Sequence, residues 1–265
     1  MHKVLFHFKA PDVVTTLFGV TQIVMYSYAV CVVLGTLLAC LLIHYDAKKS
    51  LPKWRISPAF YYSMFAAGYI GGKLFFYLEK PMYYIEKPTR ILNSFSGGLV
   101  CYGSVIAVIL FAIIYARLKK LPILGLLDVL SIASTIPIAF GRLGCFLNGC
   151  CYGIPTDHSI GMVFPTTAPI AVHPTQLYEA AWMCILFLVL SVARKYKKWN
   201  GQIFILNLTL YAIGRACIET LRGDDRGFIV QGWLSHAQTI AIAAVLISIL
   251  LFIRQHKKFI NSSLN

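Results

Sequence analysis

Arg142 is well suited to binding chemistry, because it lies in a glycine-rich segment beside an apolar run. The segment is Gly141-Arg-Leu-Gly-Cys-Phe-Leu-Asn148. An arginine at or within a membrane costs several kcal/mol unless it has a partner, so it indicates a functional site by default. Its guanidinium presents a planar fork of donors that fits a phosphate or a carboxylate. The segment therefore predicts a site for an anionic group.

A second group of polar residues lies on one face of a predicted helix nearer the end of the chain. Its members are Tyr211, Arg215, Glu219 and Arg222. At about 100° per residue they fall within an arc of roughly 80°, and such a stripe on an apolar helix must face the protein interior. One interpretation is a ladder of ion pairs that only joins helices. Against it, the arginines of both segments have only Glu179 and Glu219 as deep acidic partners, which leaves positive charge for a bound phosphate.

The segment His173-Pro-Thr-Gln-Leu-Tyr-Glu179 predicts the start of a helix. Pro174 suits a first turn, and Gln176 and Glu179 then share one face. One interpretation gives Glu179 a surface ion pair, and the other makes it a partner of groups at the membrane edge. His173 is either a candidate base or a helix-start residue held by backbone groups.

Three cysteines, Cys145, Cys150 and Cys151, lie in or beside the segment that carries Arg142. In an extracytoplasmic loop they could form a disulfide. Their spacing lacks the Cys-x2-Cys pattern of a zinc site, so we expect no metal ion. A nucleophilic role would imply covalent transfer through the enzyme, but no histidine is tied to them in sequence.

The composition identifies the elements that must position these residues as membrane helices. The chain has 58% hydrophobic residues and a mean hydropathy of +0.71, with only 13% charged residues. A soluble domain carries about 25% charged residues. Runs of about 20 apolar residues, the length of a spanning helix, occur at 21–43, 59–78, 97–116, 123–140, 177–193, 201–218 and 233–253. We therefore predict an all-α polytopic membrane protein with seven transmembrane helices.

Basic residues predict the orientation of these helices. They concentrate in the connections 44–58, 117–122 and 194–200 and in the tail after residue 253. Short Lys- and Arg-rich loops stay cytoplasmic, so the N-terminus lies outside and the C-terminus is cytoplasmic. The net charge of +14 is then a topology signal with attraction to anionic lipid, and nucleic acid is not needed as a partner.

We expect one integral membrane domain over residues 1–265, with two segments outside the spans. Residues 1–19 have too short an apolar stretch for a signal peptide and are expected to be interfacial. Residues 141–176 form a long external loop, which also contains Asp157 and His158, and loops of this length are usually functional. Residues 224–226 are expected to form a solvated turn.

Taken together, these motifs resemble the prolipoprotein diacylglyceryl transferase family, over most of the chain. The resemblance rests on Tyr28, Gly71-Gly72-Lys73, Ser96-Gly-Gly-Leu-Val-Cys-Tyr-Gly103, Gly141-Arg-Leu-Gly with Asn148-Gly, His173-Pro-Thr-Gln-Leu-Tyr-Glu179, the Tyr211 to Arg222 stripe and Leu234-Ser-x-x-Gln238. Any one piece alone would be a weak signal. Their order along a seven-span chain makes the combination specific.

The resemblance implies an activity and a set of site residues. The family moves a diacylglyceryl group from phosphatidylglycerol to the lipobox cysteine thiol of a bacterial prolipoprotein signal peptide, and glycerol phosphate leaves. By resemblance, Arg142 and Arg215 correspond to the family's essential arginines, and Tyr102, at the position of the family's candidate base, is the third residue that we expect to be catalytic. The residues expected to contact substrate are Tyr28, Lys73, Gly97, Gly98, Asn148, Glu219 and Arg222. The displacement demands no cofactor. The expected location is the bacterial inner membrane, and the expected state is a monomer among membrane lipids.

Two positions depart from the family pattern. Tyr102 lies where the family commonly has histidine, and a tyrosine with a pKa near 10 is a poor base at neutral pH. We therefore expect Tyr102 to orient the phosphate or glycerol while the arginines activate the thiol. Lys73 replaces a frequent arginine, which keeps the charge but loses the bidentate geometry.

Other functions remain open from the sequence. Tyr102 is the best argument for a relative that is catalytically silent or acts on a different acceptor. A small-solute transporter is less well supported, because transporters usually have internal repeats and polar residues throughout the membrane depth.

Overall fold

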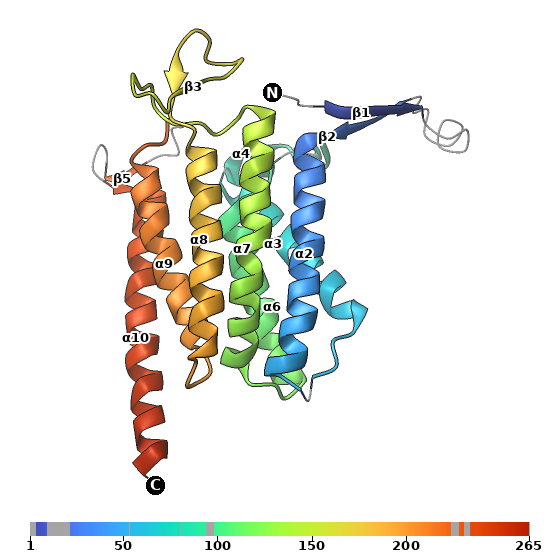
Figure 1. Cartoon of the computed structure of the whole chain (residues 1–265). Helices are drawn as coiled ribbons and strands as arrows, with labels where there is room; N and C mark the ends of the chain where they lie inside the picture. Colours follow the sequence, from blue (N-terminus) through green and yellow to red (C-terminus); the bar gives the residue numbers. More distant parts are fainter. Residues whose placement is uncertain are drawn as a thin grey trace. The chain divides into compact units, whose positions relative to one another are not determined.

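The computed structural model of this chain describes residues 4–9, 22–52, 54–79, 81–93, 98–223, 228–230 and 234–264. The described residues are mostly helical (Figure 1). Each predicted apolar run coincides with a long helix: α2 (Ser27–Ser50), α3 (Pro58–Leu78), α6 (Cys101–Leu118), α7 (Ile123–Asn148), α8 (Thr175–Lys195), α9 (Gln202–Glu219) and α10 (His236–Leu264). Two short helices, α4 (Pro81–Glu86) and α5 (Thr89–Asn93), lie between α3 and α6.

Among the described residues, five helices are long and apolar enough to cross a membrane: α2, α6, α7, α8 and α10. Large apolar side chains on them are exposed, including Leu37 and Leu41 of α2 and Leu246 and Leu250 of α10. Exposed apolar surface of this extent is what lipid solvates. The chain is therefore a multi-pass membrane protein, and the count of seven spans stays a prediction.

The first predicted span is wrong at its N-terminal boundary. Residues 22–26 form strand β2 (Gln22–Tyr26), which pairs antiparallel with β1 (Val4–Lys9), so α2 begins only at Ser27. The helix continues to Ser50 and includes Lys48 and Lys49 in its last turn, where cations favour the helix dipole. Strand β1 lies within the segment 1–19, most of which is outside the described residues.

The predicted external loop 141–176 is too long at both ends, because α7 continues to Asn148 and α8 begins at Thr175. Leu143, Phe146 and Leu147 extend the apolar helical pattern past Gly141. Gly149 ends α7 with a φ of 71°, a conformation that glycine adopts without strain. Arg142 is therefore a helical residue, and the loop comprises residues 149–174.

Backbone contacts fix the loop 149–174 to the ends of two helices. Gly153 N donates to His173 O at 2.7 Å, and Ile154 N donates to Leu221 O at 2.9 Å. A Cβ on Gly153 would lie 2.3 Å from Leu221 O, so only glycine fits. A small hairpin of β3 (Met162–Val163) and β4 (Ala171–Val172) completes the loop (Figure 1). A third pair, β5 (Phe228–Val230) and β6 (Leu234–Ser235), precedes α10.

The chain divides into two compact units, and the first comprises residues 1–43 and 130–265. Its core joins three helices through buried residues, namely Ile132 and Ala139 of α7, Met183, Leu186 and Leu190 of α8, and Ile203 of α9. Helix α9 also packs along α10 (Figure 1). A Cβ on Gly214 would lie 2.0 Å from Trp182 Nε1, so this glycine allows the close approach of α9 to α8.

The second unit comprises residues 44–129. Its helices α3 and α6 cross at glycines: a Cβ on Gly71 would lie 2.5 Å from Gly103 O, and a Cβ on Gly103 equally close to Gly71 O. Small residues at a crossing let membrane helices approach closely. Nearer the start of α3 and the end of α6, Phe60 is buried against Trp54 and Tyr115, and Trp54 Nε1 donates to Tyr115 Oη at 3.2 Å.

Candidate active site

Glu179 holds together three elements of the first unit. It lies in the first turns of α8 with only 4% of its surface exposed. Arg142 Nε of α7 lies 2.6 Å from Glu179 Oε2, and Arg222 Nη1, just beyond α9, lies 2.8 Å from Oε1. Gln176 is buried on the same face, as its spacing predicts. The interpretation of Glu179 as a surface ion pair is wrong, because the carboxylate is buried and forms ion pairs with two guanidinium groups.

Arg215 is a buried cation of the group and is only partly paired. Its Nη1 lies 2.5 Å from Glu219 Oε2 and 4.0 Å from Glu179 Oε1. The residue is 6% exposed, yet its Nη2 has no hydrogen-bond partner among the described residues. A buried donor without an acceptor costs about 1–3 kcal/mol, and more when it is charged. Nη2 is therefore a charged donor that an acceptor would stabilise.

These five residues form what we call the arginine cluster: Arg142, Glu179, Arg215, Glu219 and Arg222. Three arginines and two glutamates leave one formal positive charge. A surplus of this kind in a low-dielectric interior is stable only with an anion or water at hand. The predicted stripe on α9 is therefore an internal feature, and Tyr211 of the same stripe packs against the helix core.

Glu179 was absent from the site residues predicted from the sequence, although a signal for it existed. Gln176 and Glu179 are polar residues three apart at the start of an otherwise apolar helix. Their shared face had to be inside the protein or in water, and the sequence could not decide between these. Three arginines converge on this one carboxylate only through the packing of α7, α8 and α9.

Tyr28 and Asn148 lie at the same end of α7 as Arg142. Tyr28, at the start of α2, is 45% exposed and packs over Gly144, whose added Cβ would lie 3.0 Å from Tyr28 Cδ2. Asn148 is the last residue of α7, and its Nδ2 donates to Cys150 Sγ at 3.7 Å. Both predicted site residues therefore belong to the first unit with the arginine cluster.

Three other predicted site residues, Lys73, Gly98 and Tyr102, belong to the second unit. Lys73 is buried in α3, where its Nζ donates to Gly98 O at 3.3 Å and lies 5.2 Å from the Phe76 ring. Tyr102 is partly buried in the first turn of α6. Two predictions lie outside the described residues: the role of Gly97 and the turn at 224–226.

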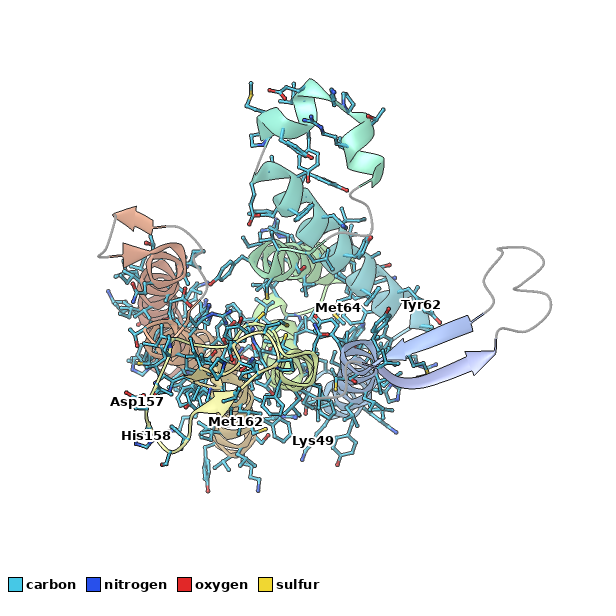
Figure 2. All side chains as sticks on the ribbon, turned by 90° about the horizontal axis from the view of Figure 1, so that it is seen from above. Lys49, Tyr62, Met64, Asp157, His158 and Met162 are labelled. Atoms are coloured by element: carbon cyan, nitrogen blue, oxygen red, sulfur yellow. The ribbon has the colours of Figure 1, made fainter. Side chains whose placement is uncertain are left out.

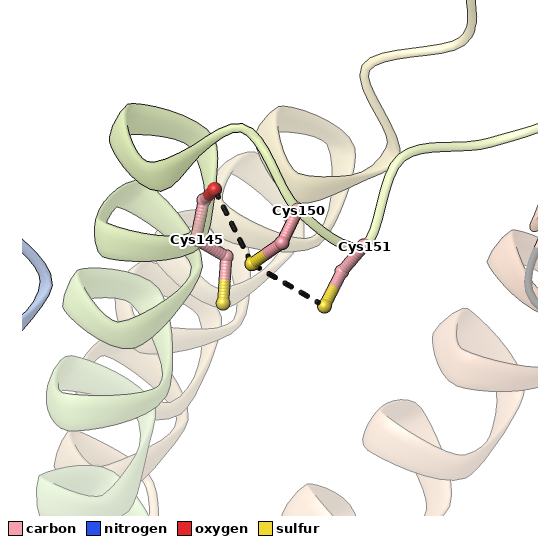
Figure 3. A group of neighbouring side chains, drawn as sticks. All are labelled: Cys145, Cys150 and Cys151. Atoms are coloured by element: carbon pink, nitrogen blue, oxygen red, sulfur yellow. Dashed lines mark hydrogen bonds between the residues drawn. The ribbon is translucent and has the colours of Figure 1, made fainter. Parts of the chain in front are cut away.

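The thiols of Cys145, Cys150 and Cys151 lie within 4.8 Å of one another (Figure 3). All three are free thiols. The interaction with the Cys145 thiol, and to a smaller extent that with the Cys150 thiol, lowers the pKa of the Cys151 thiol to about 5. Burial raises the pKa of the Cys150 thiol. We call these three residues the thiol cluster.

The remaining candidates of the loop lie apart from the arginine cluster. His173 Nδ1 lies 3.1 Å from Tyr178 Oη, and the backbone of His173 is hydrogen-bonded to Gly153 and Ile154. Asp157 and His158 are exposed at the outer edge of the loop (Figure 2). None of these three is brought into the ion pairs of the arginine cluster in the described structure.

Comparison with known proteins supports a single family. The family model described as prolipoprotein diacylglyceryl transferase matches residues 15–254. A phosphatidylglycerol–prolipoprotein diacylglyceryl transferase of Clostridium tetani is 34% identical over 244 residues, which are 89% of this chain and 95% of the relative. Proteins of the same name match from Clostridioides difficile (34% over 191 residues, 72% of this chain and 75% of the relative) and Rickettsia felis (31% over 242 residues, 88% and 91%).

Proposed function

We propose that this chain, which belongs to the prolipoprotein diacylglyceryl transferase family, transfers the diacylglyceryl group of phosphatidylglycerol to the lipobox cysteine of a prolipoprotein. The products are a thioether and glycerol phosphate. The observation that carries the proposal is the buried Nη2 of Arg215, a charged donor with no hydrogen-bond partner among the described residues. The small-solute transporter alternative is not favoured, because the curated relatives are named as transferases.

The arginine cluster suits the headgroup of this lipid. A phosphodiester carries one negative charge, which matches the one positive charge left by three arginines and two glutamates. Arg142 uses Nε for Glu179, so the outer edge of its guanidinium does not take part in that ion pair. In the proposal, Arg142 and Arg215 grip the phosphate from α7 and α9, while Glu219 orients Arg215.

The same arrangement of arginines also stabilises the transition state of the proposed reaction. The acceptor sulfur attacks the glyceryl carbon bonded to the phosphate ester, and negative charge grows on the departing phosphate. Guanidinium donors already fixed by Glu179 and Glu219 stabilise this charge more than that of the bound lipid, which lowers the barrier.

Other residues have binding roles in this proposal. Tyr28, Tyr102 and Asn148 donate hydrogen bonds to the glycerol or carbonyl groups of the lipid. Arg222 holds Glu179 in place through its ion pair. Lys73, Gly97 and Gly98 are further lipid-binding residues in the proposal.

The proposed setting is the bacterial inner membrane, with a monomer crossing it seven times. The spans are α2, α3, α6, α7, α8, α9 and α10, with the N-terminus outside and the C-terminus in the cytoplasm. Support comes from basic residues at alternate helix ends, such as Lys48 of α2, Arg117 of α6 and Lys195 of α8. Lipid then reaches the protein from the outer leaflet, and the signal peptide from the outside.

The test uses purified protein in detergent with phosphatidylglycerol and a lipobox peptide. Mass analysis of the peptide is expected to find the added diacylglyceryl group, and a peptide with serine for cysteine is expected to stay unmodified. Arg215→Ala is expected to lower kcat at least about 100-fold, the typical effect of removing one such donor. Arg254→Ala, an exposed arginine of α10, is the matched control. Full turnover by Arg215→Ala would overturn the proposal.

A further inference from the structure

The thiol cluster has the geometry of a metal site. Cys150 Sγ and Cys151 Sγ lie 3.7 Å apart, and all three sulfurs lie within 4.8 Å of one another. Two thiolates bound to a tetrahedral zinc ion at about 2.3 Å have sulfurs about 3.8 Å apart, whereas a disulfide bond measures about 2 Å. The separation of Cys150 and Cys151 is thus that of two ligands sharing one ion.

The backbone fixes the thiols in this arrangement. Cys151 has a φ of 64°, a left-handed conformation that is uncommon and unfavourable for a residue other than glycine. Gln176 Nε2 donates to Cys150 O at 2.6 Å, and Thr175 Oγ1 donates to Cys151 O at 3.0 Å. These contacts with the start of α8 turn both thiols toward Cys145 (Figure 3). The spacing of the cysteines along the sequence argues against a metal site, but the fold brings the three thiols together.

The cluster resembles an open site more than a closed structural one. In the described residues its metal-binding group has three members, and each is partly exposed. Catalytic zinc sites have three protein ligands and a fourth position for water or substrate, while structural sites have four. Asn148 donates to Cys150 Sγ, as neighbouring groups commonly do to orient a ligand. Arg142 precedes Cys145 by one helical turn and offsets thiolate charge.

We propose that Cys145, Cys150 and Cys151 bind one Zn²⁺ ion as thiolates, and that the fourth position takes the thiol of the acceptor cysteine. The role of the fourth position rests on the proposed function, and the metal site itself does not. Arg142 belongs to the arginine cluster and lies three residues before Cys145, so lipid phosphate and acceptor sulfur would meet at the end of α7.

The chemistry follows from the lowered proton affinity of a zinc-bound thiol. The acceptor thiol loses its proton on binding the ion. The sulfur electron pair forms the new carbon–sulfur bond at the glyceryl carbon, and the carbon–oxygen bond to the phosphate breaks. The leaving glycerol phosphate carries away that bond's electron pair and takes up the proton. The zinc ion keeps its oxidation state throughout, so no oxidant or reductant is required.

The first test is a cobalt titration of the reduced, metal-free, full-length protein in detergent. Co²⁺ reports thiolate ligation by a near-ultraviolet charge-transfer band and tetrahedral geometry by intense visible bands. We expect one Co²⁺ per chain, displaced by Zn²⁺, and loss of both bands in Cys145→Ser and Cys151→Ser. Cys184→Ser, an exposed cysteine of α8, is the control that keeps them. Size-exclusion chromatography checks the folding of each variant.

Absence of Co²⁺ binding by the reduced wild-type protein would overturn the metal site, whatever the variants do. The transfer assay can still succeed without a metal site, so this outcome would not contradict the proposed function. The second test adds lipobox peptide without lipid. We expect the cysteine peptide to intensify and shift the cobalt bands and the serine peptide to leave them unchanged. Bound cobalt that ignores both peptides would overturn the role in acceptor binding. Cobalt binding without any diacylglyceryl transfer would instead contradict the proposed function alone.

Discussion

At the scale of single residues, Glu179 determines the state of the site. One carboxylate with 4% exposure faces Arg142 at 2.6 Å and Arg222 at 2.8 Å, with Arg215 at 4.0 Å. Desolvating so many charges is expensive, and only close pairing offsets it. The carboxylate therefore stabilises the junction of α7, α8 and α9 and also sets the direction of the arginines that we propose to grip the lipid.

We predict that Glu179→Gln destabilises the protein by about 3 kcal/mol, because it leaves buried guanidinium groups without a counter-charge. Thermal unfolding in detergent measures this, and the transfer assay should record a parallel loss of activity. Glu86→Gln is the matched control, since Glu86 is 66% exposed and lies 3.6 Å from Arg90. Exposed pairs contribute at most about 1 kcal/mol. Equal stability of the two variants would contradict the role given to Glu179.

The hydroxyl of Tyr102 allows a second prediction at this scale. Tyr102→Phe is expected to lower kcat/KM about fivefold, the effect of losing one neutral hydrogen bond of roughly 1 kcal/mol. Tyr62→Phe is the control, because Tyr62 is 75% exposed on α3. Unchanged kinetics in Tyr102→Phe would remove this residue from the site, and a loss of 10⁴-fold or more would indicate proton transfer instead of binding.

At the scale of elements, the sequence predicted the helices well and their ends less well. Apolar runs fix where a helix must lie in a membrane, and each run coincides with one. The end of α7 was predicted eight residues early, because the polar Arg142 and the glycines around it suggested a loop. A buried carboxylate from another helix allows Arg142 to remain helical, and a linear pattern contains no sign of that partner.

The site was predictable to a similar degree and for the same reason. The stripe on α9 follows from helical periodicity, so Arg215 and Glu219 could be placed together from their spacing. The convergence of the thiol cluster could not, because it depends on the left-handed backbone at Cys151 and on hydrogen bonds from α8. Contacts between distant segments require the packed helices.

The α8–α9 contact gives a prediction about an element. Gly214→Ala would place a Cβ 2.0 Å from Trp182 Nε1, so the indole ring or α9 must shift, and we expect α9 to move and carry Arg215 away from Glu179. We expect a loss of about 1–3 kcal/mol in stability, as for overpacking elsewhere, together with lower transfer activity. Gly141→Ala is the control, since its Cβ would have nothing within 4 Å. If both alanine variants behave alike, close packing at Gly214 is not what positions Arg215.

At the scale of the whole molecule, the charged residues distinguish α9, which carries part of the candidate site, from the more apolar helices. In the part of the chain that the structure describes, five helices are long and apolar enough to cross a membrane, whereas α9 has Arg215 and Glu219 among its 18 residues. A helix with this composition is stable in lipid only if its charged face is covered by protein. In the arginine cluster, Arg215 pairs with Glu219 of the same helix and faces Glu179 of α8. The charged stripe that weakens the apolar character of α9 is thus the one that supports its proposed role.

The number of spans is tested by the side on which the loop 149–174 lies relative to the C-terminal tail. If α8, α9 and α10 all cross the membrane, the loop and the tail lie on opposite sides. If only α2, α6, α7, α8 and α10 cross, α9 does not, and the loop and the tail lie on the same side. We predict that the loop and the tail lie on opposite sides of the membrane.

Alkaline phosphatase fused after residue 165 should be active, and green fluorescent protein fused after residue 265 should fluoresce, because basic residues keep the tail in the cytoplasm. An inactive phosphatase fusion beside a fluorescent tail would reduce the count to five and move the arginine cluster and thiol cluster to the cytoplasmic side, where the signal peptide could not reach them from outside.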